Sequence, residues 1–246
     1  MKINIAITDS RIDTAAERKL TLLGYRVITL PLFSKLSDAV ASHPDMLIKR
    51  IGNEYISYAD YCEEASYVFS DLSLLSVGTG ARFTFTADEV RKEYPDDVGL
   101  NALEIGGKLF CRTKSASHTL IESAKLHGLT IVNVNQGYPA CTVLKLSETA
   151  AVTSDEGMAK ILTENGIRVT LVRQGHISLP PHEYGFIGGA GTVKDGQLFF
   201  FGDPLLHPDG EKIVSAAKAE GLRVIPLSDT PLRDLGGILF AEGNID

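Results

Sequence analysis

Short apolar runs alternate with amphipathic segments along the whole chain. The clearest case begins with two β-prone runs, residues 143–146 and 150–153, which are separated by turn-forming residues. A segment with one apolar face at helical spacing follows and ends at Gly166, where a left-handed cap residue is favoured. The β-branched run 167–172 comes directly after it. The pattern predicts two strands, a helix and a third strand, a unit too small to bury its own apolar faces.

The junction at which a helix ends on glycine and a strand begins occurs around Gly24, Gly128, Gly166 and Gly221. The second and third of these junctions are about 40 residues apart, a period typical of repeat architectures. We therefore predict a chain built from repeated strand–strand–helix–strand units. The alternative is an ordinary open α/β sheet, in which a ligand would lie at the carboxyl ends of the strands.

Two of the predicted helices begin with the spacing of a capping box, Thr14 with Glu17 and Thr153 with Glu156. The other predicted elements are strands over 3–8, 25–30, 45–50, 54–57, 82–86, 101–105, 108–112, 186–193, 197–201 and 232–240, and helices over 15–23, 58–75, 117–127 and from Asp209 onward.

The last of these strands, 232–240, has the pattern of a unit's first strand, but no helix follows it. The first unit lacks such a strand, so we predict that the two ends of the chain pair and close a ring, which leaves no exposed sheet edge. The expected organisation is a single domain over 1–246, with units at about 1–32 plus 232–246, 44–88, 96–135, 137–174 and 184–228.

Composition and charge narrow the class of partner. The chain has 246 residues, 44% of them hydrophobic, which suits one large domain with a substantial core. Its net charge of −7 argues against nucleic-acid binding. No apolar window approaches the roughly 18 residues of a membrane span and no signal peptide is visible, so we expect a cytoplasmic protein with no membrane partner. Cys62, Cys111 and Cys141 are widely spaced and fit reduced thiols. No cofactor or metal is predicted.

Three short motifs lie where predicted units begin: Gly-Tyr-Pro-Ala-Cys at 137–141, Phe-Ile-Gly-Gly at 186–189 and Leu-Gly-Gly at 235–237. With five ββαβ units closed by the C-terminal segment, the chain resembles the pentein superfamily of guanidine-modifying enzymes over nearly its whole length. The resemblance implies a five-bladed α/β propeller, a fold shared by arginine deiminases, dimethylargininases, amidinotransferases and a ribosome anti-association factor. Within it, the chain looks most like an uncharacterised bacterial branch.

The same resemblance implies a ligand channel on the propeller axis, lined where each unit's first strand begins, with the second unit contributing near Lys49. Guanidine-modifying penteins place a cysteine on the closing strand and a histidine on the first strand of the unit before it. Residues 236–239 and 186–189 contain neither, so the usual chemistry is not expected. The ligand-binding residues implied by position are Asp97, Asn101, Glu104, Gly188, Gly189 and Asp234.

Cys141 is the best remaining candidate for a catalytic nucleophile, because its position places it at the mouth of that channel. A thiolate there would require a nearby cation or helix N-terminus to lower the pKa of the thiol. The alternative is a small buried hydrophobe that begins a strand. His176 and His182 flank the loop into the fifth unit and either reach the axis or lie on the surface.

Carboxylates supply the other candidate chemistry. Asp96 and Asp97 suit a guanidinium or ammonium group, although Asp96 follows a proline and also fits a turn. Asp234 follows Arg233 and fits either an ion pair or a ligand contact, and Glu104 points either into the channel or away from it. The glycine-rich run 185–191 leads into a hairpin, not a helix, so it indicates strands that crowd an axis and not a dinucleotide site.

Three functions remain open. The first is an axial pocket for a small polar ligand, guanidino or amino-acid-like. The second is a non-enzymatic scaffold, or a ribosome- or protein-interaction module. The third is a divergent hydrolase or transferase that acts on an amidine or guanidine C–N bond through Cys141. An inward cluster of Asp97, Asp234 and Cys141 around a cavity would favour the first function, and an axis filled by apolar side chains would favour the second.

Overall fold

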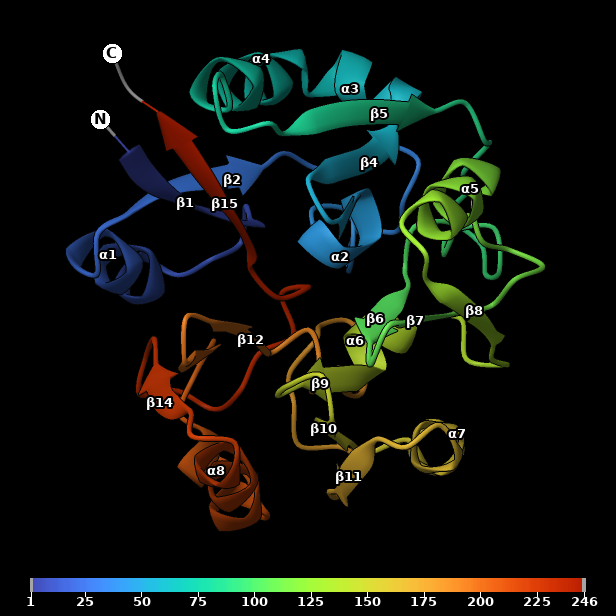
Figure 1. The fold of residues 1–246 in the computed structure, drawn as a ribbon. Helices are drawn as coiled ribbons and strands as arrows, with labels where there is room; N and C mark the ends of the chain where they lie inside the picture. Colours follow the sequence, from blue (N-terminus) through green and yellow to red (C-terminus); the bar gives the residue numbers. More distant parts are fainter. Residues whose placement is uncertain (1, 245–246) are drawn as a thin grey trace.

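The computed structural model describes residues 2–244. Their strands form five three-stranded sheets that stand around a central axis like the blades of a propeller (Figure 1). In every sheet the innermost strand pairs antiparallel with the middle strand, which pairs parallel with the outer strand. The helices that join the middle strand to the outer strand of each sheet lie around the outside of the ring (Figure 1). The predicted five-bladed α/β propeller is confirmed.

The first sheet combines the first two strands of the described chain with its last strand, and the second sheet comes next along the sequence. The first contains β15 (Leu239–Asn244), β1 (Lys2–Asp9) and β2 (Tyr25–Leu30), with helix α1 (Thr14–Leu22). The second contains β3 (Ile48–Ile51), β4 (Glu54–Tyr58) and β5 (Arg82–Thr86), with helices α2 (Pro44–Leu47), α3 (Ala59–Glu64) and α4 (Ser66–Leu75).

The other three sheets follow in chain order. The third contains β6 (Leu103–Ile105), β7 (Lys108–Cys111) and β8 (Thr130–Asn133), with α5 (His118–Leu126). The fourth contains β9 (Val143–Lys145), β10 (Ala150–Thr153) and β11 (Arg168–Leu171), with α6 (Pro139–Thr142) and α7 (Glu156–Glu164). The fifth contains β12 (Gly191–Lys194), β13 (Gln197–Phe200) and β14 (Arg223–Pro226), with η1 (Pro204–Leu206) and α8 (Gly210–Ala219).

The two ends of the chain close the ring, as the pattern predicted. Strand β15 pairs antiparallel with β1 and places Phe240 opposite Ala6. The ring of Phe240 lies 5.0 Å from that of Tyr25 and 5.2 Å from that of Phe199, measured between centroids. The last strand therefore joins the first blade to the fifth through a buried aromatic cluster.

Two predicted helix starts are wrong, because an aspartate caps each helix instead of a threonine. The Asp13 carboxylate accepts from the backbone N–H of Ala16, and the Asp155 carboxylate accepts from that of Met158. The Thr153 hydroxyl instead donates to the carbonyl of Thr142 on the neighbouring inner segment, at 2.8 Å. The predicted cap of α1 therefore lies one residue too late in the chain, and that of α7 lies two residues too early.

The starts of several inner strands also differ from the prediction. The predicted strand 45–50 begins as the helical turn α2, with Pro44 at its first position, and becomes extended only from Ile48. The fourth blade repeats this arrangement, because α6 begins at Pro139 directly before β9. The predicted strands 101–105, 186–193 and 232–240 are likewise extended only from Leu103, Gly191 and Leu239, and the predicted helix 58–75 is divided at Ala65. The chain therefore turns toward the axis before each inner strand begins.

The hydrophobic core is divided among the interfaces between neighbouring blades. Between the fourth and fifth blades, for example, Val152, Leu198 and Ile213 are fully buried in one cluster. This division leaves the axis free for polar side chains. Among the helices of residues 2–244, none is long and apolar enough to cross a membrane.

Candidate functional site

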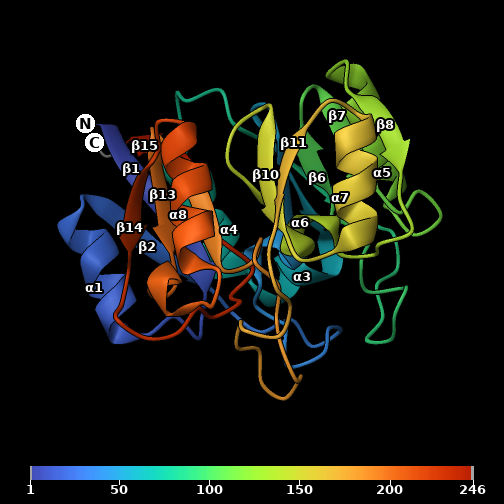
Figure 2. The ribbon, with the colours of Figure 1, turned by 90° about the horizontal axis from the view of Figure 1, so that it is seen from below.

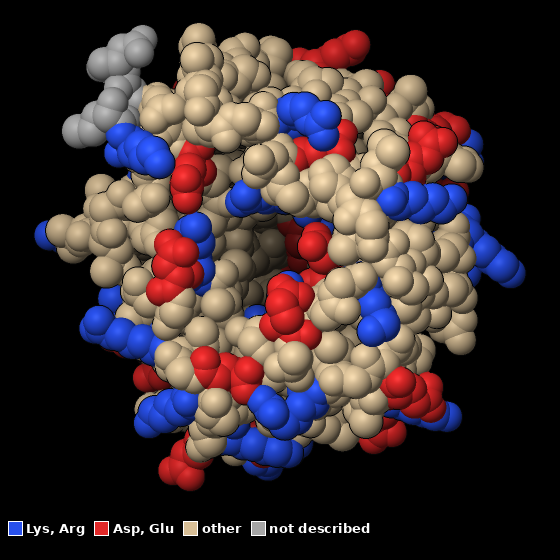
Figure 3. Space-filling view, in the orientation of Figure 1, with Lys and Arg blue, Asp and Glu red and all other residues tan. Residues whose placement is uncertain are grey.

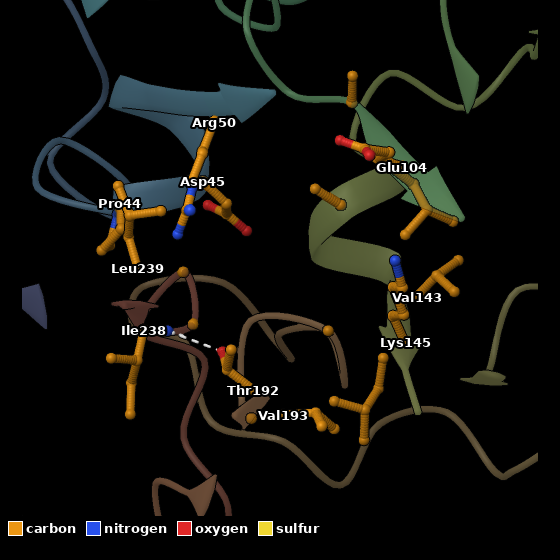
Figure 4. Close-up of a pocket in the computed structure, with 18 of the residues that line it drawn as sticks. Pro44, Asp45, Arg50, Glu104, Val143, Lys145, Thr192, Val193, Ile238 and Leu239 are labelled. Carbon is orange, nitrogen blue, oxygen red and sulfur yellow. Dashed lines mark hydrogen bonds between the residues drawn. The ribbon is translucent and has the colours of Figure 1, made fainter. Parts of the chain in front are cut away.

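The axis is hollowed on the face shown in Figure 3. This cavity, the axial funnel, has a volume of about 620 Å³ and is lined by the innermost strands of all five sheets. Acidic and basic side chains stand around its mouth in Figure 3, and Figure 4 shows its interior. Its charged lining residues are Asp45, Lys49, Arg50, Glu104, Lys145 and Glu148.

A second cavity, the loop-side pocket, has a volume of about 530 Å³. It is lined largely by the three long connections 31–43, 87–102 and 172–190, which gather along the lower edge of Figure 2. Its polar and aromatic lining residues include Tyr94, Asp97, Tyr138, Cys141, Phe186 and Asp234.

A set of polar side chains, the polar layer, lies between the two cavities. It comprises His43, Asp45, Asn101, Cys141 and Asp234. Asp45 lines the axial funnel, whereas Cys141 and Asp234 line the loop-side pocket. His43 is fully buried, and its Nδ1 lies 4.0 Å from Asp45 Oδ1 and 3.8 Å from Asp234 Oδ1. The axis is therefore closed in the middle by polar groups.

The burial of His43 favours its neutral form. Burial lowers the pKa of His43, although the carboxylates of Asp234 and Asp9 oppose that shift. Its Nε2 lies 3.6 Å from Asp9 Oδ2, and neither ring nitrogen has a hydrogen-bond partner among residues 2–244. Arg11 holds Asp9 instead, with Nε donating to Oδ1 at 2.9 Å and Nη2 to Oδ2 at 2.5 Å. Burial alone would raise the pKa of Asp9, but the hydrogen bonds from Arg11 and the nearby His43 lower it overall.

The Cys141 thiol is held as a neutral group. It is 3% exposed, and Asn101 Nδ2 donates to its Sγ at 3.0 Å. Burial raises the pKa of Cys141 well above its ordinary value, and the carboxylates of Asp45 and Asp234 raise it further. Among residues 2–244 no cation is a leading influence on the pKa of this thiol, so the environment is the opposite of one that activates a thiol.

Asp234 is fixed by backbone donors. Its Oδ2 accepts from the N–H of Phe186 at 2.8 Å, and its Oδ1 accepts from the N–H of Gly236 at 3.1 Å. Burial nevertheless raises the pKa of Asp234 to about 6, against the opposing effect of His43. A Cβ at Gly189 would lie 1.8 Å from Asp234 Oδ1, which explains why the close approach of these segments requires glycine there.

The other glycine of the pair also has a packing role. A Cβ at Gly188 would lie 2.2 Å from the carbonyl oxygen of Ala140 and 2.6 Å from that of Cys141. The fifth blade therefore presses its backbone directly against the turn that carries Cys141, and the Gly189 N–H donates to the Cys141 carbonyl at 3.1 Å. Gly188 also lines the axial funnel.

Asp97 ends a row of aromatic rings in the loop-side pocket. The Tyr138 hydroxyl donates to Asp97 Oδ2 at 2.6 Å, and the carboxylate is 3% exposed. Within the described chain, Oδ1 of Asp97 has no hydrogen-bond partner. The Tyr138 ring lies 5.7 Å from that of Tyr94 and 6.4 Å from that of Phe186. Burial raises the pKa of Asp97, although the bond from Tyr138 opposes the shift.

The residues predicted from position fall into three groups. Asp97, Cys141 and Asp234 share the loop-side pocket, together with His182, whereas His176 packs beside His207 with ring centroids 5.4 Å apart. Glu104 lies in the axial funnel, away from the two aspartates. Asn101 is 2% exposed and is used internally, because its Nδ2 also reaches the Asp45 carbonyl at 3.2 Å and its Oδ1 accepts from the Ala140 N–H at 2.9 Å.

Sequence reasoning missed His43, Asp9 and Asp45. His43 lies between the predicted strands 25–30 and 45–50, where no element was predicted, and Asp45 was placed within a strand. The available signal was His-Pro-Asp at 43–45, which precedes an inner strand as Tyr-Pro-Ala-Cys does at 138–141. Among the described residues no group of three or more His, Cys, Asp or Glu side chains is arranged to hold a metal ion.

Comparison with solved structures gives the class of fold. The inosamine-phosphate amidinotransferase of Streptomyces griseus superposes with a TM-score of 0.53 at 17% identity, covering 92% of this chain and 78% of that one. The DDAH of Pseudomonas aeruginosa in complex with citrulline gives 0.55 at 12%, covering 92% and 91%, and the agmatine deiminase of C. jejuni gives 0.56 at 10%, covering 92% and 86%. The chain therefore has the pentein fold, and at these identities the likeness concerns the fold alone.

The family is established by sequence. Residues 7–239 match the family described as "Family of unknown function (DUF6873)", and the chain belongs to it. No protein with curated annotation matches the chain.

Proposed function

We propose that the loop-side pocket binds a small organic cation, a guanidinium or alkylammonium compound, and does so without covalent catalysis. The observation that carries the proposal is Asp97, a buried carboxylate with a single side-chain donor at the end of an aromatic row. A buried charge is costly unless it is paired, and the pKa of Asp97 is already raised by burial. A cationic ligand would supply the missing charge.

The aromatic rings suit the same ligand. The faces of tyrosine and phenylalanine rings attract cations, and more strongly where water is excluded. The Tyr94 ring already accepts one, because the Arg112 guanidinium carbon lies 5.4 Å from its centroid. Lys92 at the pocket lining would suit a carboxylate at the far end of an arginine-like ligand. The structural neighbours support this ligand class by their names, which include amidinotransferase and agmatine deiminase.

The polar layer argues against a thiolate mechanism. Burial, together with Asp45 and Asp234, raises the pKa of the Cys141 thiol, and burial lowers the pKa of His43, the histidine of the layer. A nucleophilic cysteine requires the reverse electrostatics. The polar groups on the axis also argue against the interaction-module interpretation, which predicted an axis filled by apolar side chains.

Calorimetric titration with agmatine and L-arginine, and with citrulline as an uncharged analogue of arginine, tests the proposal. We expect agmatine or arginine to bind, and citrulline to bind at least about tenfold more weakly, since a charge-assisted hydrogen bond contributes roughly 1.5–3 kcal/mol. Asp97→Asn should weaken the cation by a similar factor. Asp96→Asn is the matched control, because that neighbouring carboxylate is exposed and pairs with Arg91. Equal affinity for citrulline, or full binding by Asp97→Asn, would contradict the proposal.

A further inference from the structure

The axial funnel contains an ammonium group and a carboxylate that do not pair with each other. Lys49 on β3 and Glu104 on β6 both line it. Within residues 2–244 neither side chain lies within 4.0 Å of an oppositely charged group, and Glu104 makes no side-chain hydrogen bond there. The Lys49 ammonium donates only to the backbone carbonyl of Ala102, at 2.7 Å.

Three of the other four charges of the funnel have partners, whereas the fourth, Asp45, belongs to the polar layer and has no hydrogen-bond partner at Oδ1 among residues 2–244. Arg50 donates to the carbonyls of Gly52 at 2.8 Å and Phe240 at 3.2 Å. Lys145 pairs with Glu148 at the hairpin of the fourth blade. Figure 4 shows Glu104 and Lys145 on the wall opposite Asp45 and Arg50. An ammonium and a carboxylate without a partner of opposite charge therefore line the funnel on neighbouring blades, at Lys49 and Glu104.

We propose that the axial funnel is a second ligand site, which binds a zwitterionic α-amino acid through Lys49 and Glu104. The ligand's carboxylate meets the Lys49 ammonium, and its ammonium meets the Glu104 carboxylate. An α-amino acid carries these groups on one carbon, so it bridges two side chains that do not reach each other. Charge-assisted hydrogen bonds of this kind are about twice as strong as neutral ones.

The remaining wall of the funnel selects an apolar side chain. Val143, Val193, Ile238 and Leu239 stand around the cavity in Figure 4. The Thr192 hydroxyl, which lies beside these residues, already has a hydrogen-bond partner, because it accepts from the Ile238 N–H at 2.8 Å. A ligand side chain placed here meets aliphatic groups, so we assign the site to amino acids of the leucine and valine class.

The electrostatics of Lys49 agree with an anionic ligand group. Burial lowers the pKa of Lys49 to about 8, although Glu104 and Asp45 oppose that shift. A carboxylate bound next to the ammonium would favour its charged form. This site lies on the other side of the polar layer from the loop-side pocket, and its existence does not depend on the function proposed for that pocket.

The test is calorimetric titration of the full-length protein with L-leucine and L-valine, and with two analogues of leucine. The analogue 3-methylbutylamine lacks the carboxylate, and 4-methylpentanoic acid lacks the ammonium. We expect a leucine-class amino acid to bind and each analogue to bind at least tenfold more weakly. Binding of the acid as tightly as leucine would overturn the proposal in favour of a simple anion site, and no binding by either amino acid at 10 mM, roughly the weakest affinity that a small-ligand site usefully has, would overturn it outright.

Three variants locate the binding. Lys49→Met and Glu104→Gln should each weaken leucine at least tenfold. Lys108→Met is the matched control: Lys108 also donates to a backbone carbonyl of the next blade, that of Asn165 at 3.3 Å, but lies outside the funnel. Circular dichroism establishes that all three variants fold. Unchanged affinity in both funnel variants, or an equal loss in Lys108→Met, would overturn the proposal.

Competition separates this site from the loop-side pocket. Agmatine, which has no carboxylate, should not displace leucine, and leucine should not displace agmatine. Mutual displacement would place both ligands in one cavity and overturn the assignment of a second site. Loss of agmatine binding alone would count only against the function proposed for the loop-side pocket.

Discussion

Asn101 Nδ2 donates to Cys141 Sγ at 3.0 Å and so ties the third blade to the fourth at the propeller axis. The thiol receives an amide hydrogen bond, while the carboxylates of Asp45 and Asp234 raise its pKa. Asn101 itself lowers the pKa of the thiol, yet burial and the carboxylates outweigh that effect. The most reactive atom of the pocket is thereby kept protonated.

We predict that Cys141 is inert to alkylation at neutral pH. In the Cys111→Ala background, Cys141 should react with iodoacetamide at pH 7.5 roughly tenfold or more slowly than Cys62, which is only partly buried. Burial raises the pKa of Cys62 as well, so the comparison tests the additional effect of the polar layer. Mass spectrometry of the labelled peptides gives both rates. Cys141 labelling as fast as that of Cys62 would contradict the prediction and revive the nucleophile interpretation.

A second prediction concerns pH and the buried Asp45. Burial raises its pKa from the ordinary 3.8 to about 6, so the folded protein holds this proton where the unfolded chain has lost it. The stability from Asp45 is therefore present below pH 3.8 and lost as pH rises toward 6. Asp45→Asn should be more stable than the parent by about 1–3 kcal/mol at pH 7, and the gain should disappear near pH 4.

Urea unfolding at pH 4, 5, 6 and 7 measures that difference. Asp71→Asn is the control, because this carboxylate is 55% exposed on α4. Its effect should be small at every pH. A loss of stability in Asp45→Asn at pH 7 would show that the carboxylate is paired with a charge that this structure does not reveal.

The third prediction tests the close contact between the fifth blade and Asp234. Gly189→Ala should destabilise the fold by about 1–3 kcal/mol or more, because its Cβ would lie 1.8 Å from a carboxylate held by two backbone donors. Gly157→Ala is the matched control within α7, where the added Cβ would lie 3.1 Å from Asp155 Oδ1, so the helix propensity of alanine and this contact oppose each other and the change should stay below about 1 kcal/mol. Chemical denaturation gives both values. Equal effects of the two substitutions would refute the contact.

The fourth prediction concerns ring closure. Phe240 is 6% exposed and packs against Tyr25 and Phe199 from two blades. Phe240→Ala should lower the free energy of unfolding by about 3–5 kcal/mol. Leu126→Ala, at a residue 86% exposed, should change it by less than about 0.5 kcal/mol. A small loss for Phe240→Ala would mean that the first and fifth blades are held together elsewhere.

Local pattern was sufficient for the architecture because each blade is short and its elements are neighbours in the chain. The junction at Gly166, for example, joins α7 to strand β11, which pairs with β10 directly before that helix, as Arg168 does with Ala150. Helix caps were less well predicted, since Thr153 and Asp155 both have capping chemistry. The nearby Thr142 carbonyl engages the threonine, and the aspartate becomes the cap.

The sequence by itself determined the repeat, the order of strands and helices in each blade, and the pairing of the two chain ends. It also placed Asp97, Cys141 and Asp234 near the axis. Only the tertiary structure decided that Glu104 opens into a different cavity, and that His43 lies between Asp45 and Asp234. The reason is physical: hydrophobic periodicity fixes which face of a strand is buried, but the neighbours across the axis come from distant blades and depend on how all five pack.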